Sequence, residues 1–363
     1  MRINSYLNII FLSIVFLFVG NRLATWGVED RYDPYALDFI PAVVTQVLER
    51  QEEEHGIQIT FSARITSGGM RGMEVMAIHS ISAHFDINEK EVETGDRVLL
   101  VYLDFTGEYF LANYIRINYV MILGGLFFAL VIVFGRLKGL NAILSLGFVC
   151  IAIFYVFIPA ILAGRNIYAA TIIVCLYAIL STMLTVVGAN KKALAAILGC
   201  LGGVVLAGLL MIFMDFFLNL TGFIDHETRS LTLLENPIDM RAIIFAGVTI
   251  GAVGAIMDVA MSISSSLWEL RSSGGVSDFA GIFKSGINIG KDILGTMLNT
   301  LVLAYIGSSL SLILLIAAFT TSYAELFNTE MVVVEFLRAL VGSFGMLLAI
   351  PLTSGVCGYL YGD

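Results

Sequence analysis

Residues 251–266 read GAVGAIMDVAMSISSS, and residues 287–305 read INIGKDILGTMLNTLVLAY. Both stretches lie in long apolar segments, and each contains one aspartate, Asp258 in the first and Asp292 in the second. Apolar segments of this length are typical of helices that cross a membrane. A charged side chain inside hydrocarbon costs about 3 kcal/mol or more, so both carboxylates are candidates for a functional site.

The composition is that of a membrane protein. Hydrophobic residues make up 58% of the 363-residue chain and charged residues 13%, whereas soluble domains contain about 25% charged residues. Residues 26–117 hold 16 acidic and 7 basic residues, a net charge of −9 that equals the charge of the whole chain. An acidic segment argues against nucleic-acid binding, which needs a basic surface.

We predict an α-helical polytopic membrane protein with about eight transmembrane helices. An N-terminal membrane anchor occupies residues 1–25, with its apolar run at 5–23; a cleaved signal peptide is the alternative, although no small-residue cleavage site follows. A seven-helix transmembrane domain occupies residues 118–363. Its predicted spans are 118–135, 140–162, 167–188, 193–217, 241–265, 289–319 and 332–360, each near or above the length needed to cross hydrocarbon.

Lysine and arginine in the short loops predict the orientation, because cytoplasmic loops are enriched in these residues. One side of the membrane receives seven of them: Arg136, Lys138, Lys191, Lys192, Arg271, Lys284 and Lys291. The other side receives three: Arg165, Arg229 and Arg241. We therefore expect a multi-pass protein of the cell membrane with both termini in the cytoplasm and residues 26–117 outside.

The outer segment, residues 26–117, reads as an all-β domain inserted after the first helix. Five runs are rich in β-branched and aromatic residues and are separated by turn signals: 41–48, 57–66, 73–79, 97–103 and 108–116. Five short strands suit a small barrel of the OB type, and a plain sandwich is the alternative. Because His79 and His84 would face opposite sides of a strand and the four cysteines form no CxxC spacing, we expect no metal and no cofactor.

The two aspartates lie on polar helix faces. Gly251, Ala255, Asp258, Ser262 and Ser265 are three or four residues apart, as are Asp292, Thr296 and Asn299, so each set lies on one face of its helix. A hairpin across the Gly- and Ser-rich residues 266–288 would bring both faces together. We therefore predict one polar site for a substrate or ion, formed by Asp258, Ser262, Ser265, Asp292, Thr296 and Asn299. In the alternative, Asp292 lies in the first turn of its helix among the lipid headgroups. Asp258 then makes only a structural contact with neighbouring helices, separate from Asp292.

Small residues at the same spacing predict close helix contacts, either within the chain or with a partner. These residues are Gly247, Gly251 and Ala255 in one span and Gly199 and Gly203 in another. Glu335 and Arg338 are three residues apart near the start of the last span, and a local ion pair is expected there.

The run GAVGAIMDVAMSISSSLWEL, followed by GINIGKDILGTMLNTLVLAYIGSSLSLIL, resembles the YibE/YibF membrane proteins. The outer segment, with TSGGMRGMEV at 66–75 and ETGDRVLLVY at 93–102, is similar to the soluble domain of the YibE-type member, which the shorter YibF-type member lacks. The resemblance implies pairing with a related YibF-type subunit, and a homo-oligomer is the other possibility.

Two classes of function remain open, besides the contact with the lipid bilayer that both require. The paired carboxylates and Gly-interrupted spans favour a secondary transporter or export component. A structural or regulatory scaffold, whose outer domain binds an envelope partner, is the alternative. We expect no enzyme, because the GxGD, HExxH and GxSxG signatures of intramembrane and serine hydrolases are missing from the sequence.

Overall fold

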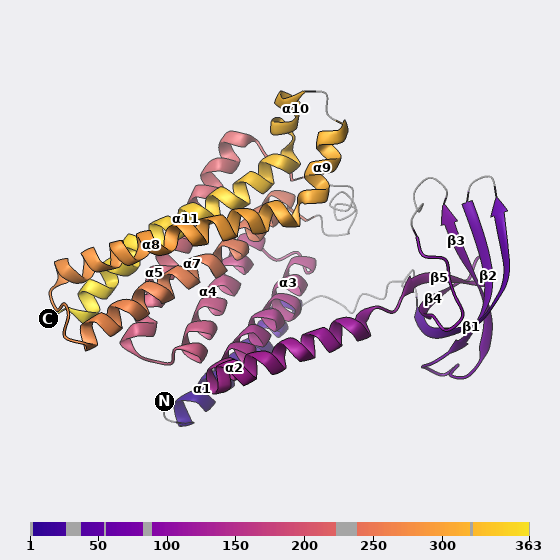
Figure 1. The fold of residues 1–363 in the computed structure, drawn as a ribbon, viewed down its shortest axis with the longest axis horizontal. Coiled ribbons are helices and arrows are strands. Elements are labelled where there is room, and N and C mark those ends of the chain that lie inside the picture. The colour runs from indigo at the N-terminus through magenta and orange to yellow at the C-terminus, as the bar shows by residue number, and fades with distance from the viewer. Residues whose placement is uncertain are drawn as a thin grey trace. The chain divides into compact units, whose positions relative to one another are not determined.

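The computed structural model describes residues 3–26, 38–53, 56–82, 89–222, 238–319 and 322–362. The chain divides into two compact units, one formed by residues 1–28 and 131–363 and the other by residues 29–130. Helices dominate the first unit, and a barrel of strands forms most of the second (Figure 1).

The second unit contains a closed five-stranded barrel. Its strands are β1 (Phe39–Glu53), β2 (Gly56–Ile65), β3 (Glu74–Ser82), β4 (Arg97–Leu103) and β5 (Glu108–Tyr114). They follow the order β1-β2-β3-β5-β4, and β4 pairs with β1 to close the barrel. All pairs are antiparallel except β3 and β5. The five predicted strands are therefore confirmed, and the closed barrel excludes the alternative of a plain sandwich.

Alternation along each strand builds the core of the barrel. Phe61 on β2, Ala77 on β3 and Leu100 on β4 are fully buried and belong to one apolar cluster. His79 lies in the same interior, with its Nε2 atom 3.4 Å from Glu89 Oε1. His84, the second histidine considered above as a metal ligand, lies outside the described residues.

The helical unit begins with α1 (Ile3–Thr25). This helix packs on other parts of the unit: Phe16 stacks on Tyr177 with ring centroids 4.1 Å apart, and Gly20 faces Val156. Arg165 Nη2 donates a hydrogen bond to the carbonyl of Trp26 just beyond the helix. These contacts make α1 part of the helical unit, and its role as a membrane anchor stays a prediction.

A long apolar run follows the barrel. It comprises α2 (Ile117–Ile151), a π-helix η1 (Ala152–Phe157) and α3 (Ile158–Leu162). Arg136 has φ 49°, which L-residues rarely adopt, and it interrupts α2. The chain turns there so sharply that Gly139 lies against the backbone of Val131.

The remaining helices of the unit are α4 (Ile167–Val186), α5 (Lys191–Leu218), α7 (Met240–Ser272), α8 (Phe279–Ser308), α9 (Leu310–Phe319), α10 (Tyr323–Asn328) and α11 (Glu330–Tyr361). The last long helix, α11, packs against α5, α7 and α8 (Figure 1). Fully buried side chains such as Ile256, Ile263 and Met346 fill the space between them.

Among the described residues, seven helices are long and apolar enough to cross a membrane. The prediction of about eight counted 118–135 and 140–162 separately, whereas these two spans fall in one helical run, Ile117–Leu162, interrupted at Arg136. The predicted span 289–319 is wrong in its bounds. It covers parts of α8 and α9, and α8 begins ten residues earlier, at Phe279.

Candidate functional site

Asp258 lies toward the middle of α7. The side chain of Asp239 caps the start of this helix by accepting hydrogen bonds from the N–H groups of Arg241 and Ala242. Asp258 follows Met240 by 18 residues, which corresponds to about 27 Å along the axis. Its side chain is exposed at the bundle surface and makes no hydrogen bond or ion pair with any residue that the structure describes.

The residues predicted to share a face with Asp258 do lie on the same side of α7. Gly251 is exposed, and Ala255, Ser262 and Ser265 are partly buried. The hydroxyl of Ser265 donates to the sulfur of Met261 at 3.7 Å. This side of α7 is therefore partly polar, and Asp258 and Gly251 are its exposed residues.

Asp292 lies well inside α8. The side chain of Asp278 caps the helix by accepting a hydrogen bond from the N–H of Gly281 at 3.0 Å. Asp292 follows Phe279 by 13 residues, about 20 Å along the axis. The alternative that placed Asp292 in the first turn of its helix is therefore wrong.

Thr296 and Asn299 share the exposed face of α8 with Asp292. The hydroxyl of Thr296 donates to the carbonyl of Ile293 at 3.0 Å. Asn299 and Asp292 make no hydrogen bond with the described part of the chain. This face therefore retains unused polar groups that a ligand or a partner can bind.

Packing contacts give the depth of Asp258 in the bundle. Gly203 on α5 faces Ile256 on α7 and Ala349 on α11. Gly203 follows Lys191, the first residue of α5, by 12 residues, or about 18 Å, and the segment around it is apolar. Because Asp258 is two residues from Ile256, its carboxylate lies at the depth of this apolar segment.

Asp292 lies at a similar depth. Gly290 on α8 faces Ile350 on α11, the neighbour of the same Ala349. Asp292 is two residues from Gly290, so its depth agrees with that of Asp258 within about one helical turn of 5.4 Å.

The two carboxylates nevertheless point in different directions. Gly286 faces Ser354 and Leu267, and Gly290 faces Ile350, so these glycines lie on the inner face of α8. Each residue turns a helix by about 100°, which places Asp292 roughly 200° from Gly290, on the opposite face. The structure brings the two aspartates to one depth without turning them toward each other, and the single shared site stays a prediction.

The small-residue faces serve packing within the chain. Gly251 gives room to the hydroxyl of Tyr305 from α8, and a Cβ there would lie 2.6 Å from it. Gly247 faces the guanidinium of Arg338, and Gly199 faces Thr353 on α11. Of the two uses left open for these glycines, the structure shows contacts inside one chain.

A second polar group, near the start of α11, was only partly visible in the sequence. Arg338 Nη1 donates to Glu335 Oε1 at 2.5 Å, which confirms the predicted ion pair. The other carboxylate oxygen of Glu335 is buried without a hydrogen-bond partner among the described residues. Tyr305 reaches toward this region across Gly251, and sequence reasoning missed it because one tyrosine in an apolar run carries no distinguishing pattern.

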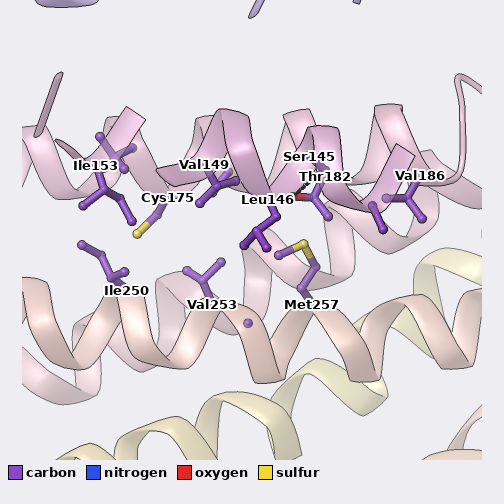
Figure 2. A pocket seen from close by; sticks show the side chains of 14 residues that line it. Ser145, Leu146, Val149, Ile153, Cys175, Thr182, Val186, Ile250, Val253 and Met257 are labelled. Atoms are coloured by element: carbon purple, nitrogen blue, oxygen red, sulfur yellow. Dashed lines mark hydrogen bonds between the residues drawn. The ribbon is translucent and has the colours of Figure 1, made fainter. Parts of the chain in front are cut away.

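An apolar cavity of about 320 Å³ lies between α2, η1, α4 and α7, and Asp258 does not line it (Figure 2). Gly254 and Met257, which precede Asp258 on α7, form part of its wall. Its polar groups are mainly two hydroxyls, and Ser145 Oγ donates to Thr182 Oγ1 at 2.9 Å. The π-helix η1 follows directly, and such bulges are frequent at functional sites. A cavity with this lining suits a hydrocarbon chain better than an ion.

Comparison with known protein families gives a match over the helical part of the chain. Residues 123–363 match the model of the family described as YibE/F-like protein. The chain belongs to the YibE/F-like family. This match covers the carboxylate-bearing helices and begins after the barrel, so the likeness of the outer segment to the YibE-type member stays a prediction. No match was found among curated proteins or solved structures.

Proposed function

We propose that this chain of the YibE/F-like family is a secondary transporter or export component whose ion-handling group is Asp258. The observation that carries the proposal is an exposed carboxylate in the middle of an apolar helix, at the depth of Gly203, without a protein partner in the described structure. Intramembrane carboxylates commonly belong to ion pathways and proton relays because an idle charge there is too costly.

The surroundings of Asp258 support this role. Ser262 and Ser265 lie on the same side of α7, one and two turns toward the end of the helix, and supply further oxygen atoms. A carboxylate at this depth needs water, a proton or a cation beside it. The proposed pathway therefore runs along this side of α7, and Asp292, Thr296 and Asn299 supply a second polar surface at similar depth on α8.

Flux measurements in proteoliposomes test the proposal. The purified chain is reconstituted with an internal pH dye, and proton and sodium movements are driven by an imposed potential. We expect flux above that of protein-free vesicles and its loss in Asp258→Asn. Glu269→Gln is the matched control, because Glu269 is an exposed carboxylate three turns further along α7. Full flux in Asp258→Asn, or no flux from the wild type, would count against transport at Asp258.

A scaffold that binds an envelope partner through its barrel is the second candidate. Its support is exposed apolar side chains on the barrel, where Met76 is 63% and Phe105 84% exposed. Tyr109 lies in this region and contacts Met70 and Tyr102. Exposed apolar side chains that lie together mark binding surfaces on soluble domains. For a scaffold, we expect the double variant Met76→Ser/Phe105→Ser to impair the function of the protein in cells. Asp258→Asn should leave that function intact.

A further inference from the structure

The outward-facing side of α8 is polar over several turns. We define the α8 outer face by six residues that are all exposed and follow one another at helical spacing: Asn288, Lys291, Asp292, Gly295, Thr296 and Asn299. The inner face of the same helix is accounted for, since Gly286 and Gly290 contact α7 and α11. Nothing in the described part of the chain covers the outer face.

This face lies at membrane depth. Gly290 is level with Ile350 and hence with the apolar middle of α5 around Gly203. Lys291 and Asp292 follow directly, and neither forms an ion pair with any described residue. A lysine can extend its ammonium group toward the interface, but the short side chain of Asp292 cannot. Two charges in contact with hydrocarbon are unfavourable, and a protein surface that covers and pairs them removes this cost.

Gly295 leaves room for another helix on this face. A Cβ atom on Gly295 would contact nothing within 4 Å in this chain, so packing within the chain does not require a glycine there. A glycine on the outer face lets another helix approach closely, and neighbouring Asn and Thr side chains form hydrogen bonds between membrane helices.

The two charges are arranged so that the face complements itself. Lys291 and Asp292 are about 100° apart around the helix axis and flank the line formed by Asn288, Gly295 and Asn299. In a dimer with a two-fold axis along the membrane normal, equal residues lie at equal depth. Lys291 of each copy then faces Asp292 of the other, which gives two reciprocal ion pairs on either side of Gly295.

We propose that the α8 outer face binds the same face of a second copy of this chain. The partner is a second copy, because Lys291 and Asp292 lie at one depth and have opposite charges. An identical helix in the same orientation therefore places each charge opposite its counterpart. A different membrane protein would have to carry the same alternation at the same depth. The contact buries Lys291 and Asp292 together and places Gly295 at the point of closest approach.

Cysteine crosslinking in native membranes tests the contact. Gly295→Cys is made in a Cys150→Ser background, because the other three cysteines are buried. Oxidation should give a covalent species of twice the chain mass. Val205→Cys is the matched control, since Val205 is 58% exposed on α5 at a similar depth but on another helix. Two differently tagged copies, expressed together, should also co-purify. A crosslink only to a protein of another mass, or none at Gly295, would overturn the proposal.

Charge reversal tests the reciprocal pairs. Lys291→Asp alone and Asp292→Lys alone each place like charges opposite each other twice, so most of the crosslinked dimer should disappear. The double variant Lys291→Asp/Asp292→Lys restores opposite charges and should restore the dimer. Failure of the double variant, with its folded yield intact, would contradict the arrangement. Because crosslinking does not depend on flux, this result is independent of the transport experiment at Asp258.

Discussion

Single glycines decide how closely the long helices approach each other. Gly286 on α8 faces Ser354 and Leu267, and an added Cβ would lie 2.7 Å from the Cβ of Ser354. Gly254 on α7 has no atom within 4 Å of the same position. Two glycines in comparable helices therefore differ only in what surrounds them.

We expect Gly286→Ala to destabilise the bundle by about 1–3 kcal/mol, because an overpacked contact must shift backbone or side chains. Gly254→Ala should leave stability unchanged or raise it slightly, since alanine favours a helix over glycine. Thermal unfolding in detergent, followed by size-exclusion chromatography of the heated samples, measures both. Equal melting temperatures for the two variants would show that α8 and α11 do not approach as closely as described.

Arg338 and Glu335 form the other residue-scale test. The pair is partly buried, so removing one partner leaves an uncompensated charge and costs less than the about 3–5 kcal/mol of a fully buried pair. Arg338→Met should therefore lower the yield of folded protein strongly, whereas Glu335→Gln/Arg338→Met should recover most of it. Detergent extraction and thermal unfolding measure the stability of both variants. A double variant as unstable as Arg338→Met would mean that Arg338 stabilises the protein through a group other than Glu335.

At the scale of elements, the barrel has a core of its own and should fold without the helices. A fragment of residues 30–116 should be soluble, give a β-type circular dichroism spectrum and unfold cooperatively. Helical or disordered behaviour of this fragment would contradict an independent unit.

The same fragment should lose stability in acid. Burial disfavours ionised Asp96, but hydrogen bonds from Lys90 and from the N–H of Glu93 outweigh it and lower the pKa of Asp96 below its ordinary 3.8. A carboxylate with a lowered folded-state pKa stabilises the fold above its unfolded pKa and loses this contribution as pH falls through the folded value. Stability should thus decline below about pH 4, and Asp96→Asn should decline less. Unfolding by urea at several pH values measures this.

The five strands were predictable because alternation and turn residues act locally. The polar faces of α7 and α8 were predictable from three- and four-residue spacing. The start of α8 was not, since Lys284, Ser285 and Asn288 lower the hydropathy before residue 289 in a segment that is helical from Phe279 onward. The direction of Asp292 was not predictable either, because it follows from which face carries Gly286 and Gly290, and that is a matter of packing.

For the whole molecule, the run from Ile117 to Leu162 decides the topology. If the break at Arg136 separates two membrane crossings, eight crossings result and both termini lie on one side. If the run crosses once, the termini lie on opposite sides. Lys284 and Lys291 lie inside α8 and leave the loop count. The five remaining residues of that side, Arg136, Lys138, Lys191, Lys192 and Arg271, still outnumber the three of the other side and favour eight crossings with the more basic side in the cytoplasm.

Cysteine accessibility distinguishes the two cases. Thr106→Cys lies in the exposed turn between β4 and β5, Arg136→Cys at the break in α2, and Ser273→Cys after α7. With eight crossings, a membrane-impermeant maleimide added to intact cells labels Thr106→Cys, while Arg136→Cys and Ser273→Cys react only after permeabilisation. Labelling of Thr106→Cys and Ser273→Cys from the same side would contradict this topology. The physical reason is that short loops rich in lysine and arginine are not moved across the membrane. The loops at Arg136 and Ser273 therefore both remain in the cytoplasm.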